Sequence, residues 1–162
     1  MSDNLNRRRH RYTEIDVMLA SSVNPLHHRK IKATVDSLRA TVEHIVYGHT
    51  AAERFHWAEI ADAANLIEAL LDLRHIDDPE GLHRDTHQAM VEAGQRVMCG
   101  KVGQLRLDAK GAVAMQDFVD GYESILRELP ARKVIQGFVL VEERLQRFMS
   151  GEKQPGVMLV EV

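Results

Sequence analysis

The sequence has few of the residues on which disulfide frameworks, sheets and membrane spans depend. It contains one cysteine, Cys99, which excludes an intramolecular disulfide and fits a reducing compartment. Aromatic residues make up only 5% of the chain, whereas alanine, leucine and methionine are frequent, and this balance favours helices over sheets. No apolar run approaches the ~20 residues that span a bilayer, and no secretory-type apolar stretch follows the N-terminal arginines. We therefore predict a cytoplasmic protein with no membrane partner.

The length and composition are those of one globular domain. Hydrophobic residues account for 44% and charged residues for 28% of the 162 positions. Such a chain is too apolar to be disordered and long enough to bury a single core. We divide it into a basic N-terminal arm (1–12), a helical domain (13–152) and an extended C-terminal tail (153–162).

Apolar residues recur at steps of three and four along most of the chain, which predicts a bundle of about five helices. Asn24 is expected to cap one helix with Pro25 at its first position, and Thr50 with Glu53 forms a capping box for the next. A short helix near 14–21 is followed by predicted helices over 24–48, 50–76, 78–100, 108–129 and 130–151. Because only Pro130 separates the last two, they are expected to form an antiparallel hairpin packed like a short coiled coil. The predicted fold class is all-α, in a single-domain bundle.

Two stretches break the helical pattern. Residues 103–107 alternate apolar and polar side chains, and the tail over 157–162 is almost continuously apolar. The two segments could pair as a minor two-stranded ribbon, or the tail could lie against the bundle. Alternatively the tail adds as a strand to another chain, which includes homo-oligomer formation with a second copy.

Charge is distributed unevenly along the chain. The arm holds four arginines and one aspartate, which leaves 17 basic and 23 acidic side chains, a net charge of −6, on the remaining residues. A second basic cluster, HHRKIK at 27–32, lies in the first turns of a predicted helix, where positive charge opposes the helix dipole. We therefore expect an anionic group to compensate for the positive charge at 27–32.

Three anionic surfaces could meet these groups: a nucleic-acid backbone, an acidic patch on a protein partner, or the acidic body of the protein itself. Alternatively, the arm simply keeps the N-terminus solvated. Zinc-finger spacing, an aromatic RNA-binding motif and a DNA-reading helix are all missing, which weakens the nucleic-acid hypothesis. Trp57 lies off the predicted buried line of its helix and could join Tyr12 and Arg54 on a contact surface. The candidate partner-binding residues are Arg7, Arg8, Arg9, Arg11, Tyr12, Arg29, Lys30, Lys32, Arg54 and Trp57.

The histidines offer only weak metal candidates. Glu53 and His56 have the i, i+3 spacing of carboxylate-bridged di-iron bundles, but no second Glu-x-x-His pair exists. His83 and His87 have an i, i+4 spacing that could chelate zinc with a third ligand from elsewhere. We therefore predict no bound metal and no cofactor.

Catalytic motifs are also missing. Cys99 lies at a predicted helix C-terminus, where the dipole disfavours a thiolate. The chain contains no Gly-x-Ser-x-Gly, phosphate-binding glycine loop or dinucleotide fingerprint. We therefore expect a protein that is not an enzyme.

Four stretches, RYTEIDVMLASSVNPL, WAEIADAANLIEALL, LRLDAKGAVAMQDFVDGYESILRELPAR and GEKQPGVMLVEV, resemble small helical proteins encoded by phages and other mobile elements of proteobacteria. The resemblance implies no catalytic residues, but it implies a context. Accessory proteins of this kind regulate their own genes, adapt host machinery or block host defences. The expected function is non-covalent binding by a protein-interaction module or an inhibitor of host machinery. The alternatives are a nucleic-acid-binding regulator that uses the basic arm, and a metal-binding helical protein.

Overall fold

The computed structural model describes residues 12–47, 52–78, 81, 83–86, 88–89 and 109–151, with Arg54 described by its backbone alone. Its helices are α1 (Glu14–Leu19), α2 (His28–Tyr47), α3 (Arg54–Asp72), α5 (Ala109–Glu128) and α6 (Ala131–Met149). Residues 83–86 and 88–89 are also helical, and no strand occurs among the residues described. The all-α single-domain prediction is confirmed. The proposed ribbon between 103–107 and 157–162 lies outside the described residues.

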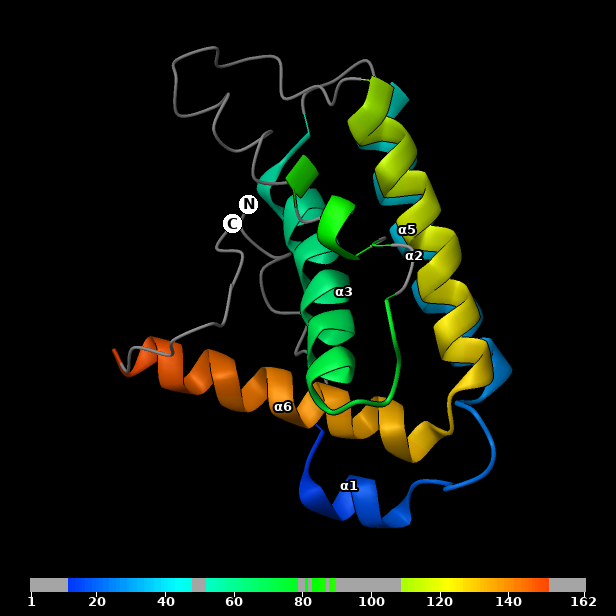
Figure 1. Ribbon diagram of the computed structural model, residues 1–162, viewed down its shortest axis with the longest axis vertical. Helices are drawn as coiled ribbons and strands as arrows, with labels where there is room; N and C mark the ends of the chain where they lie inside the picture. Colours follow the sequence, from blue (N-terminus) through cyan, green and yellow to red (C-terminus); the bar gives the residue numbers. More distant parts are fainter. Residues whose placement is uncertain are drawn as a thin grey trace, which may run out of the picture.

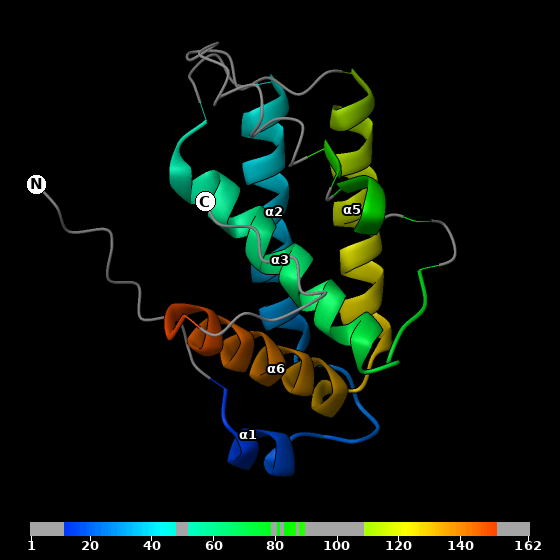
Figure 2. The same ribbon diagram turned by 60° about the vertical axis from the view of Figure 1, so that its left-hand side comes forward.

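Helices α2, α3 and α5 form one group, and α6 crosses the lower end of that group (Figure 1 and Figure 2). Helices α2, α3 and α5 run side by side, with α2 packed against both α3 and α5 (Figure 1). Helix α6 crosses beneath this group and packs against α3, and α1 lies below α6 (Figure 2). The core therefore lies between α2, α3 and α5, and α6 closes its lower end.

The predicted apolar lines of α2, α3 and α5 form most of this core. In α3, Leu66 and Leu70 are fully buried as well, because this helix is covered by α2 on one side and by α6 on another. The buried members of the predicted lines are Ile31, Val35, Leu38, Val42 and Ile45, then Ile60, Ala64 and Ile67, and finally Met115, Val119, Tyr122 and Leu126.

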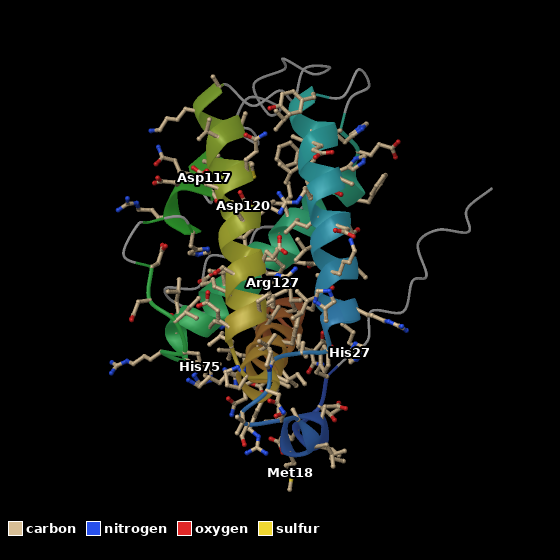
Figure 3. All side chains as sticks on the ribbon, turned by 90° about the vertical axis from the view of Figure 1, so that its right-hand side faces the viewer. Met18, His27, His75, Asp117, Asp120 and Arg127 are labelled. Carbon is tan, nitrogen blue, oxygen red and sulfur yellow. The ribbon has the colours of Figure 1, made fainter. Side chains whose placement is uncertain are left out.

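An ion-pair network connects α2 to α5; Figure 3 labels two of its members on α5, Asp120 and Arg127. Arg39 on α2 donates to Asp120 at 2.9 Å and to Glu123 at 3.0 Å on α5. Arg127 also donates to Glu123, at 2.6 Å from Nη2. The hydrogen bond from Arg127 is the main reason that the pKa of Glu123 is lowered, with a smaller contribution from Arg39. Because the network is exposed, we expect it to select the pairing of α2 with α5 more than to stabilise it.

The predicted hairpin of the last two helices is wrong. Helix α5 packs along α2, whereas α6 turns away after Pro130 and packs against α3 and α1. Pro130 has an extended backbone, with φ −55° and ψ 140°, which redirects the chain between the helices. The buried residues of α6 lie in its first two turns: Ala131, Val134, Ile135 and Gly137.

The predicted start of the second helix is also corrected. Helix α2 begins at His28, and Asn24 and Pro25 precede it in a turn. The carbonyls of Ser21 and Asn24 accept hydrogen bonds of 2.9 and 2.8 Å from the backbone N–H groups of Arg132 and Ala131. The turn is thus held by the first residues of α6, a partner that is distant in the sequence.

Candidate interaction surface

Helix α1 and the turn after it display four large apolar side chains to solvent. Ile15, Met18, Leu19 and Val23, here called the α1 patch, are 66%, 76%, 82% and 79% exposed. The first three have the i, i+3, i+4 spacing that places side chains on one helix face. In Figure 3 Met18 points away from the body of the protein. The sequence predicted the short helix, but only the tertiary structure shows that its apolar face is turned outward.

Helix α1 is firmly attached to the body. At its start, the ring of Tyr12 packs against Phe138 of α6, and within the helix the Thr13 backbone N–H donates to the Asp16 carboxylate at 2.7 Å. At its end, the Arg132 guanidinium donates to the carbonyls of Met18 and Ala20, both at 3.3 Å. Because both ends are held, the α1 patch is presented in a fixed orientation and does not need to be ordered on binding.

Tyr12, a predicted partner-binding residue, instead anchors α1. Its ring stacks on Phe138 of α6 with the centroids 5.1 Å apart. Burial, and next the nearby Asp16 carboxylate, raises the pKa of its phenol, so the ring is neutral at physiological pH. Tyr12 therefore contributes to the position of the surface more than to the surface itself.

The basic residues of the α2 start lie directly after the α1 patch in the chain. Arg29 and Lys30 are exposed, and within the described ranges their side chains form no ion pair. Lys32 donates to Asp36 at 2.6 Å, one turn along α2. The predicted arm residues Arg7, Arg8, Arg9 and Arg11 lie outside the described residues. In sequence the α1 patch is therefore bordered by basic clusters on both sides.

Trp57 does not belong to this surface, and the expectation that it is a surface residue is wrong. Its side chain is 7% exposed and is part of the hydrophobic core. The predicted buried line through Ile60 and Ile67 is narrower than the face of α3 that is buried, because both α2 and α6 cover this helix. The side chain of Arg54 lies outside the described part of the structure.

Within the described ranges, the weak metal candidates are not part of any larger group of potential ligands. His56 stacks on His44 of α2, with centroids 4.3 Å apart and ring planes 16° from parallel. Its Nδ1 accepts the Glu53 backbone N–H at 3.0 Å. This bond caps α3, which begins at Arg54, whereas the helix was predicted to begin at Thr50, a residue outside the described ranges. No group of three potential metal ligands occurs among the described side chains. Of the second candidate pair, His83 is half-buried and His87 lies outside the described residues.

A cavity of about 520 Å³ is lined by residues that include Asp117, which Figure 3 shows toward the end of the molecule opposite Met18 of α1. It holds three charged side chains, all exposed, and no serine, threonine, cysteine or histidine. Its lining residues are Asp85, Gln88, Ala89, Ala109, Lys110, Gly111, Val113, Ala114 and Asp117. A histidine base or a hydroxyl or thiol nucleophile is therefore missing from the described wall of the cavity.

The capping role of His56 predicts a pH-dependent stability. Burial, and then the positive charge of His44, lowers the pKa of His56 below its ordinary 6.5, against the opposing effects of Glu53 and Glu59. Protonation also removes the Nδ1 lone pair that accepts the Glu53 N–H. A lowered pKa in the folded state means that this contribution is complete above pH 6.5 and is lost as the pH falls. We expect the free energy of unfolding to decrease between about pH 7.5 and 5.5, by at most about 1.4 kcal/mol per pH unit from this one proton.

Urea unfolding of the wild type and of His56→Gln at both pH values checks this prediction. The glutamine amide oxygen can accept the same N–H but cannot titrate, so the variant should show a shallower pH dependence. Equal slopes for the two proteins would contradict the assignment to His56.

Among the described helices, none has an apolar stretch long enough for a bilayer crossing. Comparisons with protein-family models, with curated proteins and with solved structures find no match for this chain.

Proposed function

We propose that the protein acts by binding another protein through the α1 patch and that it is not an enzyme. The observation that carries the proposal is the clustering of four apolar side chains, each about two-thirds or more exposed, on α1 and the turn after it, where both ends of the helix contact α6. These side chains are Ile15, Met18, Leu19 and Val23. Single exposed apolar residues are ordinary on protein surfaces, but a contiguous group marks an interaction site. The spacing on α1 matches the way a helix inserts apolar anchors into a groove.

The proposal includes the biological setting. The resemblance to small helical proteins of phages and mobile elements supports an accessory protein that works in the cytoplasm of the host. In that setting the partner is a component of host machinery, and binding adapts or inhibits it. The single cysteine is in keeping with a reducing compartment.

Affinity capture from the native cell with matched variants tests the proposal. The double variant Met18→Glu/Leu19→Glu places two charges in the α1 patch without changing the core, because both side chains are exposed. Val113→Glu is the matched control: Val113 is 54% exposed and lies on α5, in the wall of the cavity and away from the patch. We expect a protein that the wild type and Val113→Glu retain and that the double variant loses by about tenfold or more. Equal recovery by all three proteins would contradict the proposal.

A nucleic-acid-binding regulator is the second candidate, and the exposed Arg29 and Lys30 favour it. The same three proteins, together with Arg29→Glu/Lys30→Glu and a variant without residues 1–11, are therefore titrated with mixed-sequence duplex and single-stranded DNA. Steeply salt-dependent binding that the basic residues control and the α1 patch does not would favour the regulator. No binding at low salt removes nucleic acid as a direct ligand.

A further inference from the structure

We propose that the first turn of α3 opens locally as the pH falls, because protonation separates His56 from His44 and releases Trp57 from the core. The device lies where the end of α2 meets the start of α3, and it is independent of the α1 patch. It goes beyond the loss of overall stability expected from His56, because it identifies the segment that opens before the rest of the domain unfolds.

Two imidazole rings face each other across the contact between α2 and α3. His44 lies in the last turn of α2 and His56 in the first turn of α3, and the centroids of their rings are 4.3 Å apart. Neutral rings can stack in this way, whereas two imidazolium ions at this distance repel each other. The contact therefore requires that at least one of the two rings is neutral.

Protonation of His56 also weakens the start of α3 itself. Its Nδ1 accepts the backbone N–H of Glu53 at 3.0 Å, and an imidazolium has no lone pair for this bond. A positive charge in the first turn of a helix also opposes the helix dipole. The same proton therefore weakens both the cap of α3 and its contact with His44.

Two carboxylates of α3 oppose these effects. Glu53 and Glu59 attract a positive charge on His56, but burial and the charge of His44 outweigh them and lower the pKa of His56. Both oxygens of Glu59 already accept hydrogen bonds from hydroxyl groups of α2. Helix α6 meets α3 in its second half, at Gly137, so the described groups that act on His56 are those of α2 and α3.

Trp57 lowers the free energy needed to open this turn. Its side chain is 7% exposed, and within the described ranges its Nε1 has no hydrogen-bond acceptor. A buried donor without a partner is destabilising, and water supplies the missing acceptor once the turn opens. Because Trp57 and His56 lie in the same turn of α3, separation of this turn from α2 also removes the indole from the core.

The direction of the pH dependence follows from the lowered pKa of His56. In the open turn the imidazole is solvated and titrates near its ordinary pKa of 6.5, so opening takes up a proton. The closed turn therefore has its full stability above pH 6.5 and loses stability as the pH falls through the lower pKa of the closed form. This one proton changes the equilibrium constant of opening by at most about tenfold per pH unit.

Amide hydrogen exchange of the full chain between about pH 7.5 and 5.5 tests the proposal, because exchange detects an open state even when few molecules occupy it. The probes are the backbone N–H groups of Ala58 and Glu59, whose acceptors in an α-helix lie four residues earlier, in the first turn. The indole N–H of Trp57, the single tryptophan, reports on the side chain. The backbone N–H of Leu70, in the second half of α3, is the reference for unfolding of the whole domain. Protection factors are compared, so the pH dependence of the exchange reaction itself cancels.

We expect the first-turn probes to be less protected than Leu70 and to lose protection by up to about tenfold per pH unit as the pH falls. Low urea concentrations should lower the protection of Leu70 but hardly change that of the first-turn probes, because local opening exposes little surface.

Three glutamine variants assign the opening to the two stacked rings. His56→Gln should remove most of the pH dependence, because the amide oxygen can accept the Glu53 N–H but cannot titrate. His44→Gln should reduce the pH dependence, because no positive charge then faces His56. His28→Gln, at an exposed position at the start of α2, is the matched control and should behave as the wild type. Circular dichroism at the highest pH confirms that each variant is folded.

The wild type alone can overturn the proposal. Protection of Ala58 and of the indole that does not change with pH would do so. Equal protection of Ala58 and Leu70, with the same urea dependence, would show that the whole domain unfolds at once and would also overturn it. A pH dependence that persists in His56→Gln, or that His44→Gln leaves unchanged, would assign the opening to other groups and overturn the role of the stacked rings.

Discussion

Replacing Gly137 with leucine is expected to lower the free energy of unfolding by about 3 kcal/mol. Gly137 lies in α6 where this helix crosses α3. A Cβ atom at this position would lie 2.8 Å from Cδ1 of Leu66 and 2.9 Å from Cδ2 of Leu70. Both leucines are fully buried, so their side chains cannot move aside without disturbing the core.

Chemical unfolding of three variants checks this prediction. In Gly137→Ala the better helix propensity of alanine, worth roughly 1 kcal/mol, offsets part of the overlap, so the loss should be clearly smaller. Ala40→Leu adds the same side chain at an exposed position of α2 and should be close to neutral. A Gly137→Leu protein as stable as the wild type would contradict the close approach of α3 and α6.

The same substitution is expected to change the position of the α1 patch. Phe138, the next residue after Gly137, supports the ring of Tyr12, and Arg132, in the first turn of α6, donates to the carbonyl of Ala20 at the end of α1. Displacement of α6 therefore moves the residues that hold α1 in place. The stability of the core and the orientation of the proposed binding surface depend on one helix crossing.

The sequence predicted the parts of the fold that follow from local periodicity. The apolar lines of α2 and α5 repeat at three and four residues, and each faces a single layer of core. Such a line is visible in the sequence because burial on one side leaves polar residues on the other. The limits of α5 and α6 were also close to those observed, because Pro130 separates the two helices.

The predictions that failed depend on contacts between distant residues. The hairpin interpretation of α5 and α6 followed from the short connection, but α6 packs against α3 instead, where Gly137 allows the two helices to approach closely. Asn24 resembled a helix cap in sequence, yet its carbonyl accepts a hydrogen bond from Ala131 of α6. Trp57 fell off the predicted line because α3 is covered on two sides.

The candidate binding surface was half predictable. The basic clusters are evident from composition alone, and the order of apolar residues in 14–19 predicts a short helix. Which face of that helix is exposed depends on Tyr12 and Arg132, whose partners on α6 and α1 are distant in the sequence. The sequence therefore identified the basic clusters that flank Met18 along the chain, but it did not identify Met18 as an exposed residue.

Replacing Glu59 with alanine is expected to cost about 2 kcal/mol, because this one carboxylate serves two hydroxyl groups of the neighbouring helix. On α3 its Oε1 accepts from Ser37 Oγ at 2.5 Å, and its Oε2 accepts from Thr41 Oγ1, both on α2. Thr41 is buried, so its hydroxyl loses its partner without gaining water.

A double-mutant cycle separates this interaction from the loss of packing. Thr41→Val removes the buried hydroxyl, so Glu59→Ala should cost less in the Thr41→Val background than in the wild type, by about 1 kcal/mol. Glu43→Ala, at an exposed position of α2, should be nearly neutral. Additive effects of the two substitutions would show that the hydroxyl and the carboxylate do not interact. A positive coupling would show that this polar contact contributes to the pairing of α2 with α3, in addition to their apolar lines.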